Sequence, residues 1–151
     1  MTFENIPPLL DEALTARGYT TLTPVQSAVI AAEAEGRDLV VSAQTGSGKT
    51  VAFGLAMAPQ ILDGGMVSLA REPAALIIAP TRELALQVHQ SLAGYAGPSQ
   101  LRVVAIFGGV GMGPQLEALR RGVDVIVATP GRLIDHVQRR SADLSAIEML
   151  I

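Results

Sequence analysis

The sequence contains no cysteine, and this absence removes several kinds of chemistry at once. Without a thiol, the 151-residue chain can form no disulfide, offers no thiolate nucleophile and cannot build a cysteine-ligated zinc cluster. Its apolar runs are too short to span a bilayer, and residues 1–10 carry Glu4 and two prolines where a signal peptide has basic and apolar segments. The sequence therefore predicts a cytoplasmic protein without a membrane segment.

Charge is also scarce, and lysine most of all. Asp and Glu number 14 against 11 Lys and Arg, so the formal net charge is −3. Bulk electrostatics therefore do not favour nucleic acid or an anionic membrane, and any polyanion must be bound by local geometry. All the basic residues are arginines except Lys49, which lies in a glycine-rich stretch.

Apolar residues, by contrast, make up 49% of the chain, and the mean hydropathy is +0.39. They occur as short apolar runs that alternate with amphipathic segments, which is typical of a parallel sheet covered on both faces. The sequence predicts a single α/β domain over residues 1–151, with a doubly wound parallel sheet, flanking helices and a loop at 63–73. We expect strands at 38–43, 74–80, 101–107 and 123–129, and helices near 7–17, 24–34, 49–62, 82–95, 114–121 and 130–139.

The stretch AQTGSGKT (43–50) matches most of the phosphate-binding P-loop pattern, with Ala43 where the strict form has glycine. It follows an expected strand and precedes an expected helix, which is the context that the motif requires. Gly46 and Gly48 permit the positive φ angles that turn backbone N–H groups toward an anion. Lys49 would reach the β and γ phosphates, and Thr50 would ligate Mg²⁺. The alternative is a glycine-rich turn that binds nothing.

Four further stretches accompany this loop: GYTTLTPVQ (18–26), PTRELA (80–85), GG (108–109) and TPGRL (129–133). Together, in order and spacing, the five stretches resemble the first half of a DEAD-box RNA helicase, and the segment 107–133 is most similar to the bacterial RhlE-like subgroup. The resemblance covers essentially the whole chain. It implies the N-terminal RecA-like domain of an ATP-dependent RNA helicase, with ATP or ADP and Mg²⁺ as cofactors. It also implies RNA and a second RecA-like domain as partners.

The same resemblance identifies what this sequence does not contain. In the family, the strand after TPGRL and its helix delivers an Asp-Glu-Ala-Asp motif, whose carboxylates orient Mg²⁺ and the attacking water. Here the chain reads LSAIEMLI and stops, and 147–151 looks like the beginning of that strand. The Ser-Ala-Thr motif and the second domain with its arginine finger are likewise absent. We therefore expect a truncated domain that binds nucleotide through Lys49 and Thr50 without hydrolysing it.

Gln26 has two interpretations. By resemblance its amide reads adenine, accepting from the N6 amine and donating to N7, while Tyr19 stacks on the base and Phe3 packs behind. Alternatively, Thr23 and Gln26 form a T-x-x-Q capping box that only completes the start of a helix; for both rings, core packing is the alternative. We favour adenine. The predicted nucleotide-binding residues are Phe3, Tyr19, Gln26, Ala43, Gln44, Thr45, Gly46, Ser47, Gly48, Lys49 and Thr50.

Resemblance also assigns RNA-backbone contacts to strand ends. Thr-containing turns before two helices could hold phosphates with their first N–H groups, and arginines add positive charge. The predicted RNA-binding residues are Pro80, Thr81, Arg82, Gly109, Thr129, Pro130, Gly131 and Arg132. As alternatives, the threonines are plain N-caps and Arg132 pairs with Glu83.

The remaining charged residues have simpler interpretations. His89 and His136 have no partners at metal spacing and are expected to be surface or boundary residues. Four arginines at helix ends are explained by the helix dipole: Arg120, Arg121, Arg139 and Arg140. Two other functions are considered, a different P-loop translocase and a non-catalytic fragment that binds partners. Gln26 and PTRELA argue against the translocase.

Overall fold

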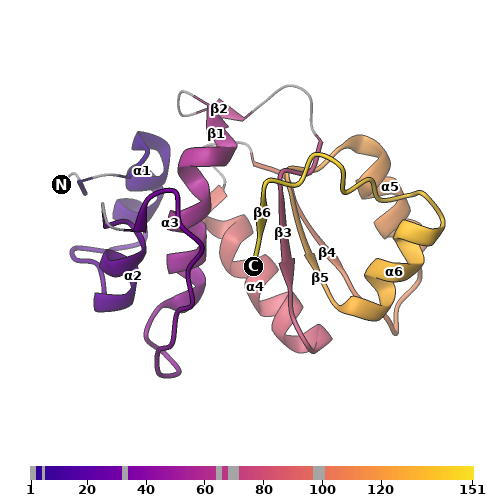
Figure 1. Cartoon of the computed structure of the whole chain (residues 1–151), viewed down its shortest axis with the longest axis horizontal. Coiled ribbons are helices and arrows are strands. Elements are labelled where there is room, and N and C mark those ends of the chain that lie inside the picture. Colours follow the sequence, from indigo (N-terminus) through magenta and orange to yellow (C-terminus); the bar gives the residue numbers. More distant parts are fainter. Residues whose placement is uncertain (1–2, 5, 32–33, 64–65, 68–71, 97–100) are drawn as a thin grey trace.

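A computed structural model describes all residues except 1–2, 5, 32–33, 64–65, 68–71 and 97–100. Its centre is a four-stranded sheet in which every neighbouring pair is parallel, in the order β4-β5-β3-β6 (Figure 1). Three of its strands lie within predicted runs: β3 (Ala75–Ile78), β4 (Val103–Ile106) and β5 (Val125–Ala128). The edge strand β6 (Met149–Leu150) lies in the apolar run 147–151.

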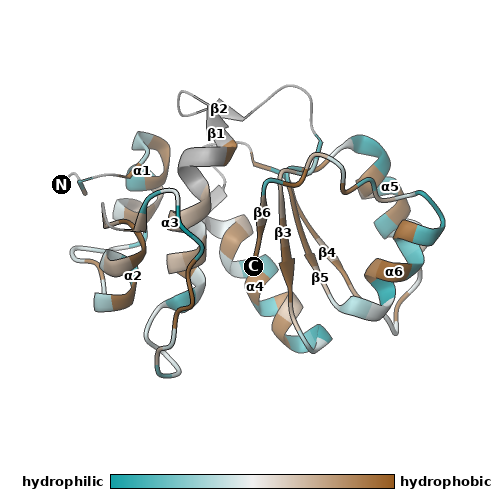
Figure 2. Cartoon of the chain, viewed as in Figure 1, coloured by the Kyte–Doolittle hydropathy of each residue, from teal (hydrophilic) through white to brown (hydrophobic). Residues whose placement is uncertain are grey.

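Helices cover both faces of this sheet, as the sequence predicts. Successive strand residues point to opposite faces, so Ile77 and Val127 pack with α3 (Lys49–Ile61) and α4 (Arg82–Ala96). Leu76 and Ile126 pack with α5 (Gly113–Arg121) and α6 (Pro130–Gln138) on the other face. In Figure 2 the strands are hydrophobic, whereas α5 is largely hydrophilic. None of the helices in the described residues is both long and apolar enough to cross a membrane.

Two short helices precede the sheet and pack on α3. The first, α1 (Pro8–Ala16), buries Leu14 completely against Leu55 of α3. The second, α2 (Pro24–Val29), begins with Thr23 as N-cap, as predicted. It ends at Val29 rather than near residue 34, and part of the predicted extension, 32–33, lies outside the described residues.

Two sequence predictions are wrong, the strand at 38–43 and the loop at 63–73. Residues 38–43 form no strand, and Val40 is fully exposed. Strand propensity is satisfied only when a neighbouring strand accepts the backbone hydrogen bonds, and no described strand pairs with this run. The predicted loop at 63–73 instead overlaps a small antiparallel pair, β1 (Leu62–Asp63) and β2 (Met66–Val67). Residues 64–65 and 68–71 lie outside the described residues.

The prediction for His136 is also wrong, because its side chain is fully buried. Its Nε2 lies 2.9 Å from Oε1 of Gln115, and its Nδ1 lies 2.7 Å from Oγ of Ser141. An amide oxygen only accepts, so Nε2 carries the proton. The Ser141 hydroxyl, whose Oγ lies beside Nδ1, donates to the His136 carbonyl at 3.1 Å. One sequence signal indicated this burial: His136 follows the apolar Leu133 by three residues, a spacing that places both on the same face of a helix. His89 is half-buried and bonds the Val103 carbonyl, which fits a boundary residue.

This burial predicts a pH-dependent stability. Desolvation lowers the pKa of His136, the charges of Arg132 and Arg139 lower it further, and Asp135 opposes them. The unfolded chain therefore takes up the proton first as the pH falls through about 6.5, so the folded state loses stability. His136→Gln should lose less unfolding free energy than the wild type between about pH 7.5 and 5.5, as urea denaturation measures. An equal or larger loss in the variant would contradict a buried neutral imidazole.

Candidate functional site

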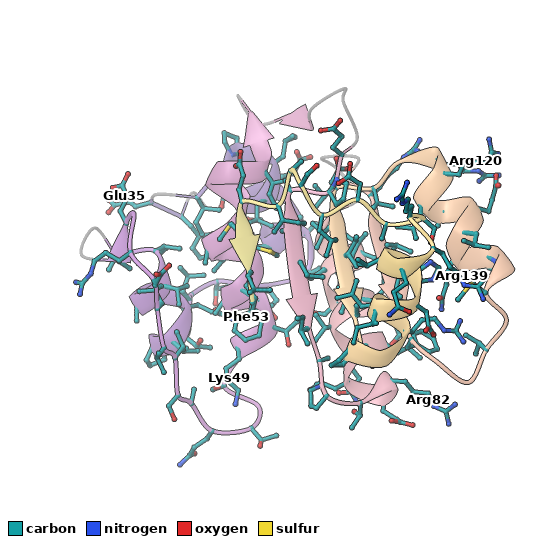
Figure 3. The ribbon with its side chains drawn as sticks, turned by 45° about the vertical axis from the view of Figure 1, so that its right-hand side comes forward. Glu35, Lys49, Phe53, Arg82, Arg120 and Arg139 are labelled. Atoms are coloured by element: carbon teal, nitrogen blue, oxygen red, sulfur yellow. The ribbon has the colours of Figure 1, made fainter. Side chains whose placement is uncertain are left out.

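The candidate residues that follow strands gather at one edge of the sheet. Because the strands are parallel, the segments that follow β3, β4 and β5 all emerge at the same edge. The loop before α3 lies at this end too, at the bottom of Figure 1. Figure 3 shows Lys49 and Arg82 at this end and Arg120 at the opposite one. Segments far apart in sequence are thus brought to a common edge.

The P-loop has the backbone that its glycines predict. Gly46 has φ of 81° and Gly48 has φ of 87°, and α3 begins at the next residue. Ser47 N–H donates to the Gln44 carbonyl at 3.2 Å, which closes the turn. Lys49 folds back, and its Nζ donates to the carbonyl of Ala43 at 2.7 Å. The lysine side chain therefore lies over the loop, where it hydrogen-bonds a neutral carbonyl oxygen.

Two features of this loop fit a phosphate group. The hydroxyl of Ser47 is buried and has no partner among the described residues. Lys49 lies at the N-terminus of a helix of 13 residues, where the positive end of the helix dipole favours an anion. Among the described residues, no group of three His, Asp or Glu side chains could hold a metal ion directly. Thr50, beside Lys49 at the start of α3, is the side chain predicted to ligate Mg²⁺.

Gln26 links α2 to the P-loop. Its Oε1 accepts from Thr23 N–H at 3.0 Å while Thr23 Oγ1 accepts from Gln26 N–H at 3.4 Å, so the capping box is formed. Its Nε2 donates to the Gly48 carbonyl at 3.3 Å, and the residue is fully buried. A Cβ at Gly48 would collide with this amide. The contact with Gly48 spans 22 positions and was not expected from the sequence. The adenine interpretation stays a prediction.

The two predicted aromatic residues lie beside α1 and α3. Phe3 and Tyr19 are partly buried against the cluster that contains Leu14, Val51 and Leu55. The backbone N–H of Phe3 also donates to Asp11 Oδ1 at 3.1 Å. Core packing, the alternative for both rings, therefore describes their contacts here. Stacking on a base stays a prediction.

Of the predicted RNA-binding residues, Thr81 and Arg82 follow β3. Thr81 caps α4, because its Oγ1 accepts from Leu84 N–H at 3.2 Å. Arg82 is exposed and forms a 3.2 Å ion pair with Glu83. Its guanidinium also lies against Gly109, where a Cβ would be 2.6 Å from Nη1. The PTRELA and GG stretches are therefore in contact.

Thr129 and Arg132 follow β5, and Arg132 contacts the loop after β4. Its Nη2 donates to the Val110 carbonyl at 3.0 Å, and its Nη1 donates to Gln115 Oε1 at 3.3 Å. Its ion pair is with Asp135, at 4.0 Å. The alternative in which Arg132 pairs with Glu83 is wrong, because closer acceptors surround the guanidinium and Glu83 pairs with Arg82. Thr129 is the N-cap residue of α6, but its side chain makes no cap hydrogen bond.

Comparison with known proteins identifies the family. Residues 23–151 match the family model described as DEAD/DEAH box helicase. The chain is 44% identical over 149 residues to DEAD-box ATP-dependent RNA helicase 3B, chloroplastic, of Zea mays. It is 45% identical over 147 residues to ATP-dependent RNA helicase DeaD of Mycobacterium tuberculosis, and 40% identical over 150 residues to RhlB of Xanthomonas oryzae.

These alignments cover 97% of the chain in each case. They cover only 20%, 25% and 26% of the three relatives, so the chain spans about a quarter of their length or less. The match begins at the N-cap of α2 and includes the P-loop and the three strand-end segments described above. The chain belongs to the DEAD/DEAH box helicase family.

Proposed function

We propose that this chain is the adenine-nucleotide-binding, N-terminal RecA-like part of an ATP-dependent RNA helicase. The observation that carries the proposal is the P-loop, where Gly46 and Gly48 adopt positive φ directly before α3 and Lys49 lies over the loop. The relatives named as ATP-dependent RNA helicases support it. Within the family, the segment 107–133 supports an RhlE-like parent.

In this proposal Lys49 exchanges the Ala43 carbonyl for the β and γ phosphates. Phosphate is the stronger acceptor because both partners are then charged. The first N–H groups of α3 and the Ser47 hydroxyl supply further donors. Thr50 ligates Mg²⁺, which supplies charge neutralisation when it is bound with the nucleotide. The residues Ala43, Gln44 and Thr45 form the first half of the loop.

The proposal assigns recognition of adenine to Gln26. Each of its two amide groups makes one hydrogen bond within the chain, which leaves Oε1 one lone pair and Nε2 one hydrogen. These are the acceptor and the donor that adenine N6 and N7 require. Gln26 is fully buried, so the base must displace the atoms that cover it. Tyr19 and Phe3, which belong to the same sequence motif, pack beside α1 and α3.

We further propose that the chain alone binds nucleotide without hydrolysing it. Phosphoryl transfer depends on groups that position the attacking water and neutralise developing charge. Lys49 and Thr50 can hold phosphate and cation, but neither orients water. In the family pattern those tasks belong to the Asp-Glu-Ala-Asp carboxylates and to a second RecA-like domain. The sequence of 151 residues contains no Asp-Glu-Ala-Asp motif.

The assignment of adenine to Gln26 predicts a base preference. The chain should bind ATP about tenfold more tightly than GTP, because GTP presents a carbonyl where adenine presents its amine. Gln26→Leu should abolish this preference, since a leucine side chain neither accepts from the adenine amine nor presents an acceptor to the guanine carbonyl. Competition against a fluorescent ADP analogue measures both affinities. Absolute affinity is a poor test, because Gln26 also bonds Gly48 and supports the P-loop itself.

The matched control for this substitution is Gln87→Leu, which makes the same change at an exposed glutamine of α4. It should keep the wild-type preference. If Gln26→Leu weakens ATP and GTP by the same factor, Gln26 only supports the loop and the adenine assignment is wrong.

RNA binding is proposed for the edge formed by Thr81, Arg82, Gly109 and the start of α6. Contacts with phosphates and sugars carry no base code, so two unrelated single-stranded oligonucleotides should bind with similar, weak affinity. The logarithm of the binding constant should fall by about 0.7 per log unit of salt for each phosphate neutralised. Arg82→Ala should therefore weaken binding and reduce the slope by about 0.7, as fluorescence anisotropy measures.

Arg120→Ala is the matched control, because Arg120 is also exposed and also paired with a glutamate, Glu117. It lies at the opposite end of the sheet from Arg82 (Figure 3). Equal losses of affinity and slope in the two variants, or oligonucleotides that differ by orders of magnitude, would show that this edge is not the RNA-binding surface.

A further inference from the structure

A buried polar cluster lies behind the proposed RNA-binding edge, and the proposed function does not use it. Its centre is Gln115 of α5, which is 6% exposed. Nε2 of Gln115 donates to the Phe107 carbonyl at 2.9 Å. Its Oε1 accepts from Arg132 Nη1 at 3.3 Å and from His136 Nε2 at 2.9 Å. We call these four residues the Gln115 cluster.

The orientation of Gln115 is determined by its partners. The Phe107 carbonyl can only accept, so the amide NH₂ must face it, and Oε1 must face the two donors. All these hydrogen bonds are satisfied at once when His136 carries its proton on Nε2. A fully satisfied buried network is rigid, whereas the loss of one member leaves a buried group unpaired. The cluster therefore fixes the atoms that it bonds.

The atoms fixed in this way flank the Gly108–Gly109 loop. The carbonyl of Phe107 is bonded by Gln115, and the carbonyl of Val110 is bonded by Arg132. Between them, Gly109 has φ of 82° and lies against the guanidinium of Arg82. Hydrogen bonds thus hold both ends of the loop, which lies between Arg82 and the start of α6.

We propose that Gln115 is a positioning residue for RNA binding. It holds the 107–110 segment and the Arg132 guanidinium in the arrangement that contacts the RNA backbone, and His136 holds Gln115 in orientation. This inference rests on the proposed function of the same edge. Gln115 itself is buried and need not touch RNA. If the loop adopts the RNA-binding arrangement for only a fraction of the time, its apparent affinity for RNA falls in proportion to that fraction.

Two substitutions at Gln115 test this role in the whole chain. Gln115→Leu removes every hydrogen bond of the amide. Gln115→Glu keeps acceptors for Arg132 and His136 but places a carboxylate oxygen against the Phe107 carbonyl. Both should raise the Kd for a fluorescein-labelled oligouridylate about threefold to tenfold. The affinity of both variants for ADP should be unchanged, because the P-loop precedes α3 whereas Gln115 lies in α5.

Two further measurements separate positioning from general stability. Backbone amide NMR signals of residues 108–110 should shift or broaden in both variants, and thermal unfolding shows that each is folded. Gln138→Leu, at an exposed position of α6, is the matched control and should leave RNA affinity and the loop signals unchanged. Should Gln115→Leu fail to fold, Gln115→Glu decides.

The outcomes distinguish this inference from the function on which it rests. If the wild-type chain binds no RNA, the proposed RNA-binding function is wrong, and the positioning role is overturned with it. If the wild type binds RNA and a folded Gln115→Glu binds it equally well, only the positioning role is overturned. Loss of RNA affinity in both variants, with ADP affinity retained, supports it.

Discussion

The parallel pairing of β3 with β5 determines where the candidate residues that follow these two strands lie. Ala75 is in register with Val125, and Ile78 with Ala128, so the two strands end together. The segments that follow them, with Thr81 and Thr129, consequently begin side by side at the carboxyl edge. β4 is paired with β5 in the same direction, which adds the GG loop to that edge. A strand of opposite direction would have placed its following segment at the far end of the sheet.

Two contacts then convert this edge into two sites. Gln26 joins the N-terminal helices to the P-loop at Gly48, and Gln115 joins α5 to the loop after β4. Each glutamine is buried and bonds a main-chain carbonyl through Nε2. Oε1 of Gln26 accepts from the Thr23 N–H, and Oε1 of Gln115 accepts from side chains of α6. A buried amide that is bonded through both its oxygen and its nitrogen specifies one arrangement of the backbone around it. In this account the first glutamine serves the nucleotide and the second serves RNA.

The features that could be predicted from the sequence are those that depend on local pattern. Strands β3, β4 and β5 are continuous apolar runs, and the glycines at 46 and 48 have the positive φ that the P-loop spacing requires. The wrong predictions concern pairing between distant segments, except for the local strand pair β1–β2 within the predicted loop. The run 38–43 has strand propensity, but its own residues do not determine which edge strand of the sheet it would pair with. The partners of His136 and Arg132 could not be predicted, because Gln115 lies 21 and 17 positions away from them in sequence.

The central claim, that the P-loop binds a phosphate through Lys49, is tested most directly by an ADP titration followed by backbone amide NMR. Lys49 currently bonds the Ala43 carbonyl, so phosphate binding must change the environment of the 43–50 backbone. The account predicts saturable shifts concentrated in residues 44–50, which Lys49→Ala abolishes and Arg120→Ala leaves unchanged. Shifts that are scattered over the surface, or that persist unaltered in Lys49→Ala, would contradict it.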